Sequence, residues 1–292
     1  MSFATETTSI VVREIRTTDE VRALEDLQIK VWGDDERDVV PLNQLVAASY
    51  VGGSLIGAFD GARVAGFVYG FYGHIGGRIV HHSHMLAVDP EYRRHDLGFR
   101  LKAAQREKVL ADGLTDRITW TFDPLQSLNA HFNFVKLGVV SDTYKINVYG
   151  EQGVSFLHQN GTDRLFVTWL LNSRRVQKCL SRQKERAADQ ADMRKNVLLL
   201  LRNSDSGNPE RQAEIDESSA PRFASIEIPV DINSIEREDF GLARRWREET
   251  REVFSQAFSH GYLAVDYSLE NERTGSYLLE RARPDQFGEG ST

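Results

Sequence analysis

The spacing of hydrophobic residues in the first half of the chain alternates between strand-like and helix-like. Apolar positions recur every three or four residues between Asp19 and Trp32, and the Asp60-Gly61 pair between two apolar runs is a strong hairpin signal. The pattern predicts strands over 10–16, 79–88 and 116–122, a hairpin over 54–72, and helices over 19–32, 42–48, 97–111 and 128–137. This order of elements indicates an α/β domain over residues 1–150.

The second half of the chain has a weaker pattern. Residues 151–202 are interpreted as a connecting segment, with a β-branched and aromatic strand over 163–171 and a charged helix over 173–195. Residues 203–222 are polar and contain almost no large apolar residues, which predicts a flexible linker. Residues 223–292 form a predicted C-terminal extension, with a strand over 224–232, a helix over 237–260 and a strand over 262–269.

Composition narrows the classes of function. The 292 residues carry a net charge of −7, which argues against a nucleic-acid-binding protein, whose surface is normally basic. The single cysteine, Cys179, excludes an internal disulfide framework. The sequence shows no signal-like segment and no long apolar span, so we expect a cytoplasmic protein without a membrane partner.

Residues 84–101, HMLAVDPEYRRHDLGFRL, contain the clearest chemical signal. An apolar strand end runs into a proline turn, a basic loop and then a helix. The first N–H groups of a helix have no acceptor within the helix, and the helix dipole adds positive potential there, so this arrangement favours a bound phosphate. Arg93, Arg94 and His95 add side-chain donors. On this segment alone, a solvated basic connection is an equal alternative.

The segment resembles the coenzyme A pyrophosphate loop of the GNAT acyltransferases, whose pattern reads roughly V-x-P-x-x-(R/Q)-x-x-G-x-(G/A). Val88, Pro90, Arg93 and Gly98 match it. Asp96 replaces the first glycine, which removes backbone freedom and adds a carboxylate beside the expected pyrophosphate. The resemblance implies the GNAT fold, a mixed and splayed central sheet flanked by helices, here with a C-terminal α/β extension. It also implies acetyl-CoA or another acyl-CoA as co-substrate, and no metal.

A second segment, SLNAHFNFVKLG over 127–138, is similar to the family's N-x-x-A-x-x-x-Y-x-K-x-G pattern. The matching positions are Ala130, Lys136 and Gly138. Ser127 replaces the usual Asn, and Phe134 replaces the tyrosine that often protonates the leaving thiolate in the family. Because a phenylalanine cannot donate a proton, another group does this work, solvent does it, or the domain no longer catalyses. Tyr144 and Tyr149 are candidate donors and equally candidate packing residues.

Three further segments strengthen the resemblance. HSHMLAV at 82–88, WTFDPL at 120–125 and WREETREVF at 246–254 are similar to segments of a poorly characterised group of GNAT-like bacterial proteins. The last of these lies in the C-terminal extension. Its aromatic residues are most simply core positions, and a homodimer face is the alternative.

The strand over 79–88 carries candidate catalytic histidines. His82 and His84 are two residues apart, so they face the same side of a strand, whereas His81 faces the other. An imidazole has an ordinary pKa of about 6.5, which suits removal of a proton from an ammonium group. Arylalkylamine N-acetyltransferases of this superfamily have paired histidines in a similar arrangement, which implies that His84 and His82 are the bases. Core packing and a weaker zinc site with His81 are the alternatives.

The resemblance therefore implies an N-acyltransferase that acts on a small primary amine or amino acid, by direct attack in a ternary complex. Its predicted coenzyme contacts are Leu86, Ala87, Val88, Arg93, Arg94, His95, Asp96, Leu97, Gly98, Phe99 and Phe134. Trp120 and Asp123, at the end of a strand, are predicted to contact the acceptor amine, although such aromatic residues are more commonly core. The rival hypothesis is a catalytically degenerate acyl-CoA-binding or protein-interaction module, which Asp96 and Phe134 motivate.

Overall fold

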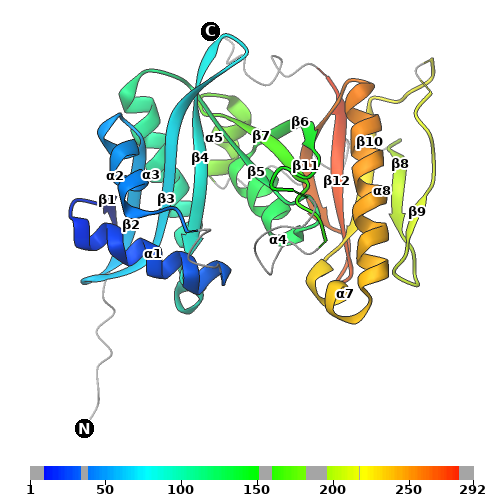
Figure 1. Ribbon diagram of the computed structural model, residues 1–292. Coiled ribbons are helices and arrows are strands. Elements are labelled where there is room, and N and C mark those ends of the chain that lie inside the picture. The colour runs from blue at the N-terminus through cyan, green and yellow to red at the C-terminus, as the bar shows by residue number, and fades with distance from the viewer. Residues whose placement is uncertain (1–9, 34–38, 151–159, 182–195, 217, 283–292) are drawn as a thin grey trace. The chain divides into compact units, whose positions relative to one another are not determined.

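The computed structural model describes residues 10–33, 39–150, 160–181, 196–216 and 218–282 (Figure 1). The described residues form two compact units, of which the first ends at Ile118 and the second begins at Thr119. The predicted domain boundary at residue 150 stays a prediction. The division falls inside strand β5 (Arg117–Phe122), where the sequence has no break in its apolar pattern to mark it.

The first unit is an antiparallel sheet between two helical layers. Its strands β1 (Val11–Glu14), β2 (Ser54–Asp60), β3 (Arg63–Ile75) and β4 (Arg78–Val88) lie side by side in chain order. Helices α1 (Thr18–Trp32) and α2 (Leu42–Tyr50) pack on one face, and α3 (Leu97–Asp112) packs on the other. Alternation along β2 supplies both cores, since Leu55 and Phe59 face α1 and α2 while Ile56 and Ala58 face α3.

Local sequence signals explain the boundaries in this unit. Thr17 begins α1 with a capping box, in which its side chain accepts a hydrogen bond from Glu20 N–H and the Glu20 side chain bonds back to Thr17 N–H. Gly61 has φ +60° in the turn between β2 and β3, which is the conformation that the predicted Asp60-Gly61 hairpin requires. The predicted α/β class and the helices and strands of this region are confirmed.

The second unit is a mixed sheet with helices of its own. Its strands follow the spatial order β5, β7 (Arg164–Leu170), β6 (Val140–Lys145), β11 (Tyr262–Leu269), β12 (Thr274–Arg281), β10 (Phe223–Pro229), β8 (Leu198–Asn203) and β9 (Pro209–Arg211). Strands β8 and β10 are parallel. The helices are α4 (Ser127–Ala130), the π-helical η2 (His131–Leu137), α5 (Arg174–Leu180), α7 (Ile232–Glu238) and α8 (Phe240–Ser259). Figure 1 shows α8 lying along these strands, and it contacts α7 and strands β6, β8, β9, β10 and β11.

The second half differs from prediction in several elements. The predicted linker over 203–222 contains β9, which pairs with β8 through Leu201 and Arg211. A three-residue polar edge strand has no hydrophobic periodicity, so no sequence pattern indicated it. Strands β6 and β12 and helix α7 were not predicted either. The predicted helix over 173–195 is α5 up to Leu180, and residues 182–195 lie outside the described chain. In the part that the structure describes, no helix has the length and apolar composition to span a membrane.

Candidate active site

The loop between β4 and α3 is anchored by a buried carboxylate. Asp89 is 2% exposed and begins the short helix η1 (Pro90–His95) by accepting a hydrogen bond from Glu91 N–H at 3.1 Å. The same carboxylate accepts hydrogen bonds from Lys30 Nζ at 2.9 Å and from Arg63 at 2.8 Å. Both cations also bond the Glu91 carboxylate. The acidic residues at the start of the loop are thus paired, and the basic residues follow them.

Asp96 joins η1 to α3 in the left-handed conformation, with φ 55° and ψ 24°. This region of backbone space favours glycine, and Asp is among the residues that tolerate it best. The Asp96 side chain makes no capping hydrogen bond to α3. The turn for which the family uses glycine is therefore formed with Asp in its place, and the N–H groups of the first turn of α3 are not capped by this side chain.

The other predicted loop residues divide into exposed donors and buried anchors. Arg93 and His95 are exposed, and the side chain of Arg94 lies outside the described structure. Leu97 is 1% exposed and belongs to the core between α3 and the sheet. The half-buried residues of the first turn of α3 are Gly98 and Phe99. The exposed Arg93 and the positive end of the helix dipole make this end of α3 electropositive.

Strand β4 has a bulge at the predicted catalytic residues. Ser83 pairs with Gly70 whereas Met85 pairs with Tyr69, so His84 is the extra residue on β4. A bulge interrupts the alternation of side chains. As a result His84 and Met85 both lie on the face that carries Phe71, which is the face covered by α1 and α2.

The two predicted bases share one aromatic surface. The ring centroids of His82 and His84 are 6.4 Å apart, and both rings contact Phe71, at 5.7 and 6.0 Å. The Tyr69 ring meets His84 edge to face at 6.0 Å. The arrangement agrees with the spacing argument, which put His82 and His84 on one side of the strand.

Loss of water lowers the pKa of both imidazoles. The pKa of His82 falls to about 4, chiefly because burial disfavours the charged ring and secondly because His84 and Lys102 are nearby. The ring of His84 is exposed, yet the surrounding protein still removes enough water to lower its pKa. Imidazoles in this state are neutral at pH 7 and can accept a proton.

The opposite face of β4 buries several polar side chains, of which the sequence analysis named only His81. His81 is fully buried there, its ring meets Tyr72 edge to face at 5.0 Å, and neither ring nitrogen has a hydrogen-bond partner among the described residues. Lys102 and Gln105 of α3 are buried on this side too. Their positions one and four residues after the inward-facing Leu101 could have indicated that they are buried. A lysine on a helix is normally solvated, however, so the sequence analysis did not consider it.

The strand end that follows the histidines is packed into both cores. Ala87 is 1% exposed and faces α1 and α2, whereas Leu86 and Val88 pack against the α3 side. On one edge these residues pair with β3, in the register Phe67 to Ala87. Their predicted contact with coenzyme A through backbone N–H groups stays a prediction.

Phe134, in the second unit, is fully buried among aromatic rings. Its ring contacts Phe122 at 6.2 Å and Tyr277 at 5.7 Å, both edge to face. Tyr277 lies on β12, and its hydroxyl donates to the Pro124 carbonyl at 2.6 Å. Ser127, the other position that departs from the family pattern, accepts a hydrogen bond from Tyr267 of β11 at 2.7 Å. Tyrosines of the C-terminal extension thus contact both residues that differ from the family pattern.

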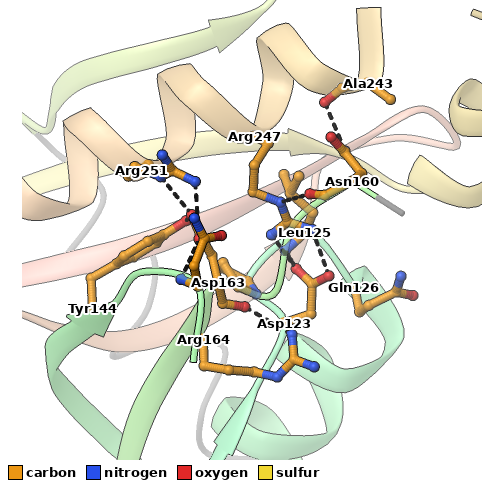
Figure 2. Close-up of polar contacts among 12 residues, drawn as sticks. Asp123, Leu125, Gln126, Tyr144, Asn160, Asp163, Arg164, Ala243, Arg247 and Arg251 are labelled. Carbon is orange, nitrogen blue, oxygen red and sulfur yellow. Dashed lines mark hydrogen bonds and ion pairs between the residues drawn. The ribbon is translucent and has the colours of Figure 1, made fainter. Parts of the chain in front are cut away.

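The two predicted acceptor residues have partners inside the second unit. Trp120 is 8% exposed, and its indole N–H donates to Asn133 Oδ1 at 3.2 Å. Asp123 forms a two-pronged ion pair with Arg247 of α8, at 2.6 and 2.7 Å (Figure 2), and accepts a hydrogen bond from Leu125 N–H at 2.9 Å. Binding of an amine at Asp123 stays a prediction, and it would require Arg247 to share this carboxylate.

A second carboxylate, that of Asp163, also binds an arginine of α8. It is fully buried and accepts hydrogen bonds from Arg251 at 2.8 Å and from the Tyr144 hydroxyl at 2.9 Å (Figure 2). Burial raises the pKa of Tyr144 well above its ordinary value. Tyr149, the other candidate proton donor, is 51% exposed and lies under the Arg164 guanidinium.

Metal ligands are a separate question. In residues 10–33, 39–150, 160–181, 196–216 and 218–282, no group of three or more His, Cys, Asp or Glu side chains is placed to hold a metal ion. The zinc alternative for the three histidines of β4 therefore gains no support from their geometry, since His81 lies across the strand from His82 and His84.

Residues 17–138 match the model of the acetyltransferase (GNAT) family. No curated protein matches the chain in sequence. Among solved structures, the ribosomal-protein-S18-alanine N-acetyltransferase from Escherichia coli is 13% identical with a TM-score of 0.44, covering 56% of this chain and 94% of that one. The aminoglycoside 6'-N-acetyltransferase from Enterococcus faecium is 17% identical with a TM-score of 0.42, covering 56% and 98%. An aminoglycoside 6'-N-acetyltransferase complexed with coenzyme A is 16% identical with a TM-score of 0.42, covering 56% and 98%.

Proposed function

The chain belongs to the GNAT acetyltransferase family through residues 17–138, and from this premise we propose that it is an acyl-CoA-dependent N-acyltransferase. The donor is acetyl-CoA or another acyl-CoA, and the acceptor is a small primary amine or an amino acid. The amine attacks the thioester directly in a ternary complex, so no covalent enzyme intermediate forms.

The observation that carries the proposal is the pair of neutral imidazoles on β4. His82 and His84 lie 6.4 Å apart on one face, and the pKa of each is lowered, so both are ready to accept a proton at neutral pH. An amine becomes nucleophilic only after it loses the proton of its ammonium form. His84, the more exposed of the two, removes that proton directly or through water, and His82 supports it.

The loop after β4 supplies the coenzyme contacts. Arg93, Arg94 and His95 bind the pyrophosphate together with the first N–H groups of α3, because these residues directly precede that helix. The backbone at Leu86 to Val88 polarises the acyl carbonyl. Asp96 weakens this binding, since its carboxylate repels the phosphates.

Two residues of the second unit remain candidates for acceptor binding on sequence grounds. Trp120 would provide an apolar wall, and Asp123 a carboxylate for the amine. If Asp123 has this role, the acceptor shares it with Arg247, whose guanidinium takes both carboxylate oxygens.

Calorimetric titration with acetyl-CoA and with succinyl-CoA, followed by thiol release in the presence of a panel of amines, tests the proposal. We expect saturable binding and amine-dependent release. Absence of binding of either coenzyme ester would contradict the proposal at its first step.

The base assignment has its own test. His84→Ala should lower kcat/KM by about a hundredfold or more, because a positioned general base contributes that much, and should leave coenzyme binding intact. His74→Ala is the matched control, since His74 is an exposed histidine on the neighbouring strand β3. Equal turnover of the His84→Ala variant and the parent at every pH would remove His84 as the base.

The second candidate function is acyl-CoA binding without catalysis. It is favoured by Phe134, which is fully buried and has no proton to give at the position where the family often has a tyrosine. This alternative predicts binding in the calorimeter and no amine-dependent thiol release with any member of the panel.

A further inference from the structure

On the α3 side of the first sheet, polar side chains are buried behind the two histidines. There, Lys102 Nζ donates hydrogen bonds to Ser83 Oγ at 3.0 Å and to Gln105 Oε1 at 2.8 Å. Gln105 Nε2 in turn donates to Ser54 Oγ at 3.0 Å. The exposed fractions are 2% for Lys102, 5% for Ser83 and 0% for both Gln105 and Ser54. A hydrogen-bonded chain therefore links α3 to β4 and β2 inside the core.

A lysine is energetically unfavourable at this buried position. Burial disfavours the charged ammonium group, so the group gives up its proton more easily, and burial holds the pKa of Lys102 well below its usual range. A leucine or methionine would fill the same space without that penalty. What the lysine adds is a directed hydrogen bond to Ser83.

Ser83 is the residue on which this bond has the greatest effect. It lies between His82 and His84 and is the last regularly paired residue before the bulge, where His84 has no partner on β3. The orientation of an extra residue in a bulge is set by its neighbours in the strand. A tether on Ser83 therefore fixes the direction in which His84 leaves the strand.

The other end of the tether lies on the helix that begins at the coenzyme loop. Lys102 and Gln105 belong to α3, whose first residue follows Asp96. An anion bound at the start of this helix would act on Lys102 through the backbone of one continuous helix.

We propose that Lys102 is a positioning residue that couples occupancy of the coenzyme loop to the orientation of His84. The inference rests on the proposed function for the roles of the loop and of His84. Lys102 itself does not touch substrate. Its hydrogen bond fixes the position of Ser83, which determines the geometry of the bulge. The bulge in turn determines the orientation of the His84 imidazole.

The groups around His84 allow a clean readout. The titratable side chains in ring contact with it are His82 and Tyr69, and α2, which packs on the same face, contains no charged residue. On α1, Lys30 is bonded to Asp89 and Glu91, and Glu25 accepts a hydrogen bond from Leu42 N–H. A change in the pKa of His84 on substitution of Lys102 therefore reports the position of its ring.

The test compares Lys102→Met with Lys108→Met. Methionine keeps the volume of the lysine stem, and Lys108 is the matched control because it lies on the same helix and pairs with Asp112 at the surface. We expect Lys102→Met to bind coenzyme A with little change in Kd and to lose about tenfold in kcat, the size seen when a residue orients a catalytic group through another. In NMR titration of the free protein, the His84 pKa should rise toward its ordinary value, because a ring that is no longer held against the protein gains water. The control should show neither change.

Coenzyme A provides the second readout. Saturation with coenzyme A should shift the His84 ring resonance in the parent protein and in Lys108→Met, and the shift should be lost in Lys102→Met. Ser83→Ala, which removes the tether from the other side, should behave like Lys102→Met and serves if that variant does not fold.

A folded Lys102→Met or Ser83→Ala variant with the parent's kcat, His84 pKa and coenzyme-induced shift would overturn the inference. Failure of the proposed function is distinguishable from this result. If the parent releases no thiol, the acyltransferase proposal fails, and the His84 pKa in the free variants still decides whether Lys102 positions the ring.

Discussion

Lys102 in the first unit and Arg247 in the second are both buried cationic side chains, at 2% and 3% exposed, but the protein treats them differently. Lys102 donates hydrogen bonds to the neutral groups Ser83 and Gln105, and burial lowers its pKa. Arg247 is joined to the Asp123 carboxylate at both ends of its guanidinium. Burial alone would lower the pKa of Arg247, but its charge interaction and hydrogen bonds with Asp123 raise it.

The difference follows from the chemistry of the two groups. A lysine in the core can lose its proton and stay as a neutral donor, whereas a guanidinium cannot be deprotonated in a protein and must bring an anion with it. The first unit thus contains a buried lysine, hydrogen-bonded to neutral groups, behind its histidines. The second unit contains a charged clamp that holds α8 to the end of β5 (Figure 2).

The largest expected effect is the loss of stability when the Asp123 carboxylate is removed from its ion pair with Arg247. Asp123→Ala leaves the Arg247 guanidinium in the core without its carboxylate, and we expect the free energy of unfolding to fall by about 3–5 kcal/mol. Urea denaturation followed by tryptophan fluorescence measures this loss. The double variant Asp123→Leu with Arg247→Met should recover most of it, because an apolar pair of similar volume needs no counter-charge.

Asp19→Ala is the control for that experiment. Asp19 pairs with Arg22 on the surface of α1 with its side chain 92% exposed, so its loss should leave the unfolding curve almost unchanged. Equal destabilisation by the two substitutions would mean that the Asp123–Arg247 pair behaves as a surface pair.

His81 is a third buried basic side chain, and its expected effect on the free energy of unfolding is smaller than that of Asp123. Burial, followed by the nearby Lys102, lowers the pKa of His81 to about 3. The unfolded chain, with an ordinary imidazole pKa of about 6.5, binds a proton that the folded chain does not. The His81 contribution to the free energy of unfolding is therefore complete above pH 6.5 and is lost at about 1.4 kcal/mol per pH unit as the pH falls toward 3.

Denaturation of the parent and of His81→Leu at pH 7 and pH 5 measures this contribution. The parent should lose about 2 kcal/mol more than the variant between the two pH values. His82 is present in both proteins and cancels from the difference. Parallel pH profiles would show that His81 takes up its proton in the folded state.

The smallest expected effect belongs to an exposed region, the proposed coenzyme loop. Asp96→Gly removes a non-glycine residue with φ 55°, which should stabilise the protein by up to about 1 kcal/mol, less the favourable interaction of the carboxylate with the helix dipole. Affinity for coenzyme A should rise, because a negative charge leaves the loop.

Calorimetry and thermal denaturation of Asp96→Gly measure both quantities. Asn196→Gly is the control, since Asn196 also has a positive φ, of 62°, but lies in the second unit. It should gain stability without a gain in affinity. Unchanged affinity in Asp96→Gly would count against the assignment of the loop.

Prediction from the sequence was best where the signal is local. The Asp60-Gly61 turn, the first helix and the common face of His82 and His84 all depend on residues within one turn or one strand, and the structure contains them. The bulge at His84 was not predicted, because it depends on the register between β3 and β4.

What the sequence determined by itself was the order of elements in the first half, the electropositive start of α3 and the residue types available for chemistry, because these follow from spacing, turn residues and the helix dipole. Tertiary structure decided which of these side chains lose water. Asp123 and Arg247 are far apart in sequence, and Lys102 meets Ser83 only across the packed face of a sheet. Burial and partnership depend on which segments pack together, so the charge state and function of these groups are properties of the fold.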